Sequence, residues 1–102
     1  MTDITSELLS GASPFLSGLF YDSLKRKVVL KAVNNPEDML IVRVITFPGI
    51  TKYSESIEEI DDELIDGVIG INWLNDSQIC IKTNLREIII TLTGKPHGQT
   101  VT

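Results

Sequence analysis

From residue 24 onward, apolar and polar side chains alternate in short runs rich in β-branched residues, which is the pattern of half-buried β-strands. Turn-forming residues such as those of "NNPED" separate the runs. Most connections are short, and parallel neighbours would need long crossovers, so the pattern favours an antiparallel meander. The predicted strands are residues 24–33, 39–47, 68–74, 77–83 and 86–93.

The ends of the chain are less regular. Residues 15–21, "FLSGLFY", fit either a sixth strand or part of an N-terminal helix that begins near Thr5, so residues 1–23 are predicted to be helical or mixed. Three consecutive isoleucines at 88–90 make both faces of the last strand apolar, which predicts a central place in the sheet or cover by a helix. Residues 98–102 are expected to form a frayed tail.

The run "SESIEEIDDELIDG", residues 54–67, is predicted to form a short helix. Ser56 to Glu59 has the S-x-x-E form of a capping box. Apolar side chains recur at helical spacing, at Ile57, Ile60, Leu64 and Val68. The predicted fold class is therefore α+β: an antiparallel meander of five to six strands, an N-terminal helix and a short acidic helix.

Length and composition indicate one ordinary globular domain over residues 1–102. The apolar fraction is 42% and the charged fraction 23%, as in soluble proteins with a packed core. The single cysteine excludes an intrachain disulfide and fits a reducing compartment. The first residues are acidic and no apolar run approaches the ~20 residues that span a bilayer, so we expect a cytoplasmic protein that does not bind membranes.

Negative charge is concentrated in one part of the chain. Of the net charge of −5, residues 53–81 contribute eight acidic side chains and no basic one, which leaves +3 for the remainder. Such segregation repels nucleic acid and attracts a basic surface. The positive charge of the remainder lies largely in Lys25, Arg26, Lys27 and Lys31, a group too small and too poor in aromatic neighbours to predict a nucleic-acid site.

Local energetics disfavour this density of carboxylates on a helix. Four of them would lie where the helix dipole does not favour them, and no Lys or Arg follows at i+4 to relieve their repulsion. A partner outside the fold would explain them, and the alternative is a solvated helix face. The candidate partner-binding residues are Glu58, Glu59, Asp61, Asp62, Glu63 and Asp66, with Tyr53 and Asp76 at the margins.

No catalytic, metal or cofactor signature is evident. The acidic run lacks the spacing of an EF-hand loop, and carboxylates on a wet face do not acquire the raised pKa that acid–base catalysis needs. His97 is the only histidine, and Cys80 is more typical of a small buried hydrophobe than of a nucleophile paired with it. Trp73 is predicted to be a core residue, and Gly70 to mark a bulge or a close approach of another backbone. We therefore expect a non-enzyme without metal or cofactor.

Three segments together resemble small bacterial immunity proteins, including those of contact-dependent growth inhibition: "FPGI" at 47–50, the acidic run, and "GINWLNDSQICIKTNLREIII" at 70–90. The resemblance implies an inhibitor that caps the basic active-site cleft of a cognate toxin nuclease. A pattern sufficient for one core, without a cluster of cysteines or histidines, separately predicts a monomer or weak dimer that needs no metal to fold. The alternative is a structural or regulatory subunit that self-associates through its sheet, with the acidic helix only solubilising. An enzyme using carboxylates and a bound metal comes third.

Overall fold

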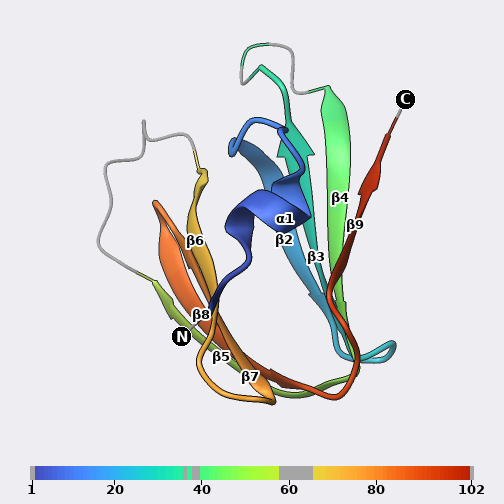
Figure 1. Cartoon of the computed structure of the whole chain (residues 1–102), viewed down its shortest axis with the longest axis vertical. Helices are drawn as coiled ribbons and strands as arrows, with labels where there is room; N and C mark the ends of the chain where they lie inside the picture. Colours follow the sequence, from blue (N-terminus) through green and yellow to red (C-terminus); the bar gives the residue numbers. More distant parts are fainter. Residues whose placement is uncertain (1, 36, 38–39, 58–65, 102) are drawn as a thin grey trace.

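The described part of the chain forms two antiparallel β-sheets and one short helix (Figure 1). The computed structural model describes residues 2–35, 37, 40–57 and 66–101. The elements in chain order are β1 (Thr2–Asp3), α1 (Thr5–Leu9), β2 (Leu16–Asp22), β3 (Lys27–Val33), β4 (Ile41–Pro48), β5 (Ile50–Ile57), β6 (Val68–Trp73), β7 (Gln78–Thr83), β8 (Arg86–Leu92) and β9 (His97–Thr100).

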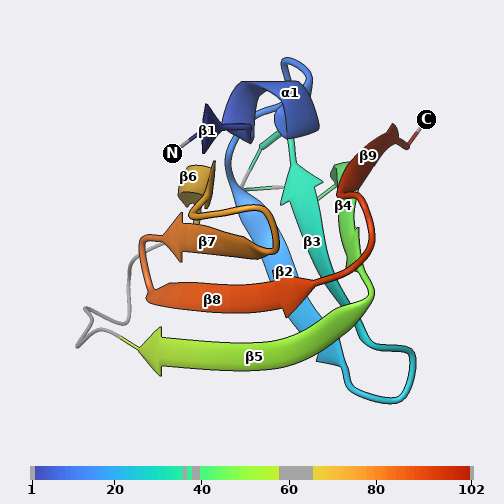
Figure 2. The same cartoon turned by 60° about the horizontal axis from the view of Figure 1, so that its bottom comes forward.

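The two sheets face each other across one core. The five-stranded sheet has the order β1-β6-β7-β8-β5, and the four-stranded sheet has the order β2-β3-β4-β9. Every strand pair is antiparallel. The sheets stand on opposite sides of the molecule in Figure 1, with α1 between them at one end. Figure 2 shows the strands of the two sheets crossing at a large angle.

Two bent strands carry the chain from one sheet to the other. Only Gly49 separates β4 from β5, and the partners of these strands, β9 and β8, also follow each other in the chain. At the corner, the Thr93 N–H donates to the Gly49 carbonyl at 2.9 Å and the Gly94 N–H to the Pro48 carbonyl at 3.3 Å. Gly49 has φ +71°, which glycine adopts without strain. The corner therefore depends on glycine.

A second junction joins the sheets on the opposite side. Phe15, just before β2, forms an isolated bridge with Gly67, just before β6. The Leu16 N–H donates to the Asp66 carbonyl at 3.0 Å, and the Val68 N–H to the Pro14 carbonyl at 2.9 Å. These bonds satisfy backbone groups that a sheet edge would otherwise leave unpaired. Backbone hydrogen bonds thus join the two sheets at this junction as well as at the corner.

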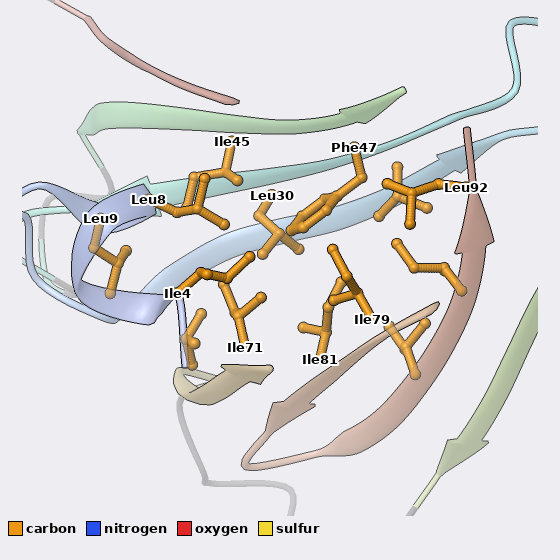
Figure 3. Packing of buried hydrophobic residues seen from close by; sticks show 14 of the residues in the cluster. Ile4, Leu8, Leu9, Leu30, Ile45, Phe47, Ile71, Ile79, Ile81 and Leu92 are labelled. Atoms are coloured by element: carbon orange, nitrogen blue, oxygen red, sulfur yellow. The ribbon is translucent and has the colours of Figure 1, made fainter. Parts of the chain in front are cut away.

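The core lies between the sheets and is almost entirely aliphatic (Figure 3). Alternate residues of each central strand point inward, so that Ile79, Ile81, Ile88 and Ile90 are fully buried against Leu30, Ile45 and Phe47. Helix α1 closes one end with Ile4, Leu8 and Leu9. Arg43 fixes that helix, because its Nε donates to the Leu8 carbonyl at 2.7 Å.

The predicted α+β class holds only in part, because the described residues are mostly β-strand, in two sheets, with a single helix of five residues, α1. The helix near Thr5 is confirmed, and the open choice for residues 15–21 is decided in favour of a strand, β2. The five predicted strands are present as β3, β4, β6, β7 and β8. They belong to two sheets and not to a single meander, because β4 and β5 turn from one sheet into the other.

The predicted acidic helix is wrong where the structure describes it. Ser54–Ile57 continues β5 and pairs with β8, with Ser56 opposite Glu87 and Ile57 opposite Arg86. Ser56 is therefore a strand residue and not a helix cap. Pairing with β8 satisfies the backbone groups that face β8 along this stretch, which outweighs a local capping preference of about 1 kcal/mol. Residues 58–65 lie outside the described residues.

The tail is also more ordered than expected. His97–Thr100 forms β9 and pairs with β4 from Thr46 to Arg43. Gly98 is essential to this arrangement, because a Cβ there would lie 2.6 Å from the Leu8 carbonyl oxygen and would contact the Arg43 guanidinium. The frayed tail predicted for residues 98–102 is thus wrong for Gly98 to Thr100, since backbone pairing and contact with α1 hold them.

Candidate functional site

The structure describes only one of the six predicted partner-binding residues. Asp66 lies at the second junction, half-buried, where its carboxylate accepts a hydrogen bond from the Gly67 N–H at 3.0 Å and its carbonyl accepts one from Leu16. It therefore has a structural part in joining the sheets. The other five, Glu58, Glu59, Asp61, Asp62 and Glu63, lie outside the described residues.

Both ends of the acidic run meet the same end of the five-stranded sheet. Ile57, the last residue of β5, pairs with Arg86, and Val68, the first residue of β6, pairs with Thr83. The β7–β8 turn at residues 84–85 lies between these two pairs. The chain thus leaves and re-enters the sheet beside that turn, and Ile57 is 70% exposed there.

Beside this end, four side chains connect β5 to β2 and β8. Tyr53 donates its hydroxyl hydrogen to Glu55 Oε1 at 3.1 Å, and Arg86 Nη1 donates to the same oxygen at 3.1 Å. Tyr53 also stacks on Tyr21, with ring centroids 4.4 Å apart and planes 5° from parallel. Desolvation by burial, followed by the negative charge of Glu55, raises the pKa of Tyr53 to about 12.

This cluster neutralises Glu55 within the protein. Arg86–Glu55 is the only ion pair in the part of the chain that the structure describes, and both side chains are little more than a quarter exposed. An exposed partner would have to compete with Arg86 for this carboxylate. Glu55 is therefore a structural residue, and Tyr53, expected at the margin of the binding surface, is half-buried beside it.

Strand β5 has a free edge. It pairs with β8 on one side, and on its other side only the Ile50 N–H finds a backbone partner among the described residues, the Arg26 carbonyl at 2.8 Å. Figure 2 shows β5 at one margin of its sheet. An edge of this length presents N–H and C=O groups to which another strand can add.

Trp73 differs from the predicted core residue, because it packs against the core but is only partly buried. It also lines two hollows. The larger, of about 450 Å³, is formed by Thr2, Trp73, Leu74, Asn75 and Asp76, and the smaller, of about 70 Å³, by Ile4, Glu7, Leu8, Trp73, Lys95 and Pro96. The larger hollow contains Asp76, which the sequence placed at the margin of the binding surface.

Cys80 and His97 belong to different sheets. Cys80 lies on the outer face of the five-stranded sheet between Asn72 and Ile89, as its alternation with the fully buried Ile79 and Ile81 predicts. Burial raises the pKa of its thiol, with a smaller contribution from the charge of Glu87. His97 is exposed in β9, so the structure does not bring together the Cys–His pair considered from the sequence.

Four of the basic residues lie in the four-stranded sheet or in the turn that joins two of its strands. Lys25 and Arg26 form the turn between β2 and β3, and Lys27 and Lys31 belong to β3 itself. Lys31 is partly engaged, because its ammonium lies 5.1 Å from the centre of the Phe20 ring. These four basic residues therefore belong to the four-stranded sheet and its β2–β3 turn, whereas Ile57 of β5 and Val68 of β6 belong to the other sheet.

Within the described residues, no group of three or more His, Cys, Asp or Glu side chains is placed to hold a metal ion. The same part of the chain contains no helix of the length and apolarity that a membrane span requires. Comparison with known proteins finds no matching family model, no matching curated protein and no matching solved structure.

Proposed function

We propose that this protein is a non-catalytic binding protein that presents its acidic run to a basic surface of another protein. The observation that carries the proposal is the presence of eight acidic and no basic side chains in residues 53–81. Glu55 and Asp66 have partners inside the fold, so the proposed contact residues are Glu58, Glu59, Asp61, Asp62 and Glu63, together with Asp76. Opposite charges on two surfaces steer their encounter and fix their orientation.

The specific form of the proposal is an immunity protein that neutralises a toxin nuclease. A nuclease binds a polyphosphate, so its active-site cleft is basic. Carboxylates placed over that cleft satisfy its charge and exclude the substrate. Steering between such surfaces gives association rate constants of about 10⁸–10⁹ M⁻¹s⁻¹ at low salt, which suits an inhibitor that must act before its target cuts.

The test begins with capture of the partner from the native host and its identification by mass spectrometry. The charge-removing variant Asp61→Asn, Asp62→Asn, Glu63→Gln keeps the shape of the side chains. The matched control, Glu37→Gln, Asp38→Asn, Glu87→Gln, removes the same charge elsewhere in the chain. We expect the first variant to lose about tenfold or more in affinity at low salt, mainly through slower association, with a smaller loss for the control.

Stability separates a binding role from a structural one. Each surface substitution should change the free energy of unfolding by no more than about 0.5 kcal/mol. Equal loss of affinity in the two triple variants would mean that only net charge matters, and unchanged affinity in both would leave the acidic run as a solvated surface. Either result would contradict the proposal.

A second candidate function is self-association through the free edge of β5. Two copies can pair antiparallel about a two-fold axis near Ser54, which would continue the sheet across the dimer. The substitutions Ser54→Lys and Ser56→Lys place like charges across such a junction, where they repel. Sedimentation equilibrium should then show a dimer for the unmodified protein and a monomer for the lysine variant. An unmodified protein that is a monomer at every concentration would exclude this candidate.

A further inference from the structure

The only tryptophan of the chain stands at the wall between two hollows. Trp73 ends β6, where it pairs with Thr2 of β1 on one side and with the fully buried Ile79 of β7 on the other. Its indole packs partly on the core and is partly accessible from the hollows. Partly exposed tryptophans in pockets are among the side chains that contribute most to protein–protein binding.

The larger hollow is formed by a turn that hydrogen bonds hold in place. The Leu74 N–H donates to the Gln78 carbonyl at 2.8 Å, Asn75 Nδ2 donates to Gln78 Oε1 at 2.7 Å, and Asn75 Oδ1 accepts from the Ser77 N–H at 2.9 Å. The polar atoms of Asn75 are thereby engaged. The Asp76 carboxylate, in contrast, forms no hydrogen bond or ion pair with any residue that the structure describes, so it remains for a ligand.

An aromatic wall, an apolar neighbour and an unengaged carboxylate together match one side chain best. The guanidinium of arginine stacks on an indole, and its N–H groups bind a carboxylate in a fixed planar geometry. Leu74, 38% exposed, offers apolar contact for the arginine methylene groups. An anionic ligand would be repelled by Asp76 and by the charge of residues 53–81.

The smaller hollow favours a different neighbour. Besides Trp73, its lining includes the apolar side chains of Ile4, Leu8 and Pro96, and Glu7 and Lys95 contribute one charge of each sign, so its net charge does not favour a second cation. A small apolar side chain fits there. The two hollows share Trp73, so they suit an arginine and an apolar residue that are close together in the partner.

We propose that the larger hollow, which is lined by Trp73 and Asp76, binds an arginine side chain of the basic partner and is the anchor of the interface. This inference rests on the proposed function. The acidic run re-enters the sheet at the start of β6, and Trp73 lies five residues further along this strand, a distance of about 17 Å. One partner with an ordinary interface of about 800 Å² per side can cover both places.

The first test uses N-acetyl-arginine amide as the probe. Its binding is followed by the fluorescence of Trp73 and by the NMR signal of the indole N–H, both of which report this site alone because the chain has one tryptophan. A ligand of this size should saturate the site with a dissociation constant on the order of millimolar. N-acetyl-citrulline amide, which has the same shape without the charge, should bind about fivefold more weakly.

Two variants complete the titration. Asp76→Asn should weaken the arginine probe about fivefold, and Glu37→Gln, which removes a charge from a distant turn, should leave it unchanged. The proposal is overturned by the absence of a saturable signal, by equal binding of the citrulline probe, or by unaltered binding to Asp76→Asn.

The captured partner provides the second test. Asp76→Asn should weaken its binding mainly by faster dissociation, whereas the charge-removing variant at residues 61–63 slows association. Full affinity of Asp76→Asn for the partner would refute the anchor even if the probe binds. Full affinity of the 61–63 variant, with a loss for Asp76→Asn, would instead refute the proposed function of the acidic run and leave the hollow as the binding site.

Discussion

Replacing Gly49 by alanine should destabilise the protein strongly, because this residue forms the corner between β4 and β5. Its φ of +71° is unfavourable for any residue with a Cβ. A Cβ at this position would also contact Thr93 Oγ1 and would lie 2.8 Å from the Gly94 nitrogen and 3.3 Å from the Thr93 nitrogen. Thr93 cannot move away freely, since its N–H donates to the Gly49 carbonyl.

A second glycine separates the two contributions. Gly11 has φ +84°, and a Cβ there would meet nothing within 4 Å. Gly11→Ala therefore carries only the backbone strain of about 1–2 kcal/mol, reduced by about 0.4–1 kcal/mol because alanine restricts the unfolded chain. Gly49→Ala adds the cost of crowding, about 1–3 kcal/mol. We expect a total of about 2–4 kcal/mol for Gly49→Ala and about 1 kcal/mol or less for Gly11→Ala.

Urea denaturation followed by Trp73 fluorescence and by far-ultraviolet circular dichroism measures both values. For a two-state transition, the lower midpoint with an unchanged slope gives the loss of stability directly. A Gly49→Ala midpoint equal to that of Gly11→Ala would show that the corner relaxes without cost. The close contact of Gly49 with Thr93 would then have no energetic role.

Three further predictions test other contacts. Arg43→Met should lower the free energy of unfolding by about 1.5–3 kcal/mol, because the Leu8 carbonyl loses a charged donor, and a thermal melt that shows no decrease would contradict this. In a Tyr21→Phe variant, the phenolate absorbance of Tyr53 should titrate near its pKa of about 12. The contribution of neutral Tyr53 to the free energy of unfolding is full below about pH 10, where an unfolded tyrosine is still neutral, and is lost as pH rises through about 12. Titration of Tyr53 near pH 10 would refute the burial argument. The Cys80 thiol should react slowly with a disulfide reagent in the folded protein and rapidly in urea, because burial raises its pKa, and equal rates would contradict this.

The sequence predicts strands well where one face meets the core. In β3, Val28, Leu30 and Ala32 alternate with half-buried residues and are fully buried in the structure. Strand β5 escaped prediction because residues 51–56 are nearly all polar, as an edge strand permits, and because Ser56–Glu59 resembles a helix start. Its pairing with β8, some thirty residues away, is a nonlocal interaction that no local pattern contains.

The candidate site shows the same limit. Alternation with Ile71 placed Trp73 in the core. Trp73 does pack against the core, but it is only partly buried. Ile69 does not share this face and is 58% exposed, because the register shifts between Val68 and Gly70, where the glycine had predicted a bulge. The hollow itself forms where Thr2 pairs with Trp73, a contact between residues far apart in the chain, so no local signal could have revealed it.

The shared corner of the two sheets has a consequence for how the chain folds. Because β4–β5 and β8–β9 each belong to both sheets, the pairing of Ile57 with Arg86 and that of Arg43 with Thr100 are set by the same two bent segments. Forming them closes long loops before much apolar area is buried, which slows folding in proteins dominated by nonlocal pairs. Neither sheet can be completed without the other, so we expect a slow, cooperative transition in which both sheets melt together, and a fragment ending before Thr93 should remain unfolded.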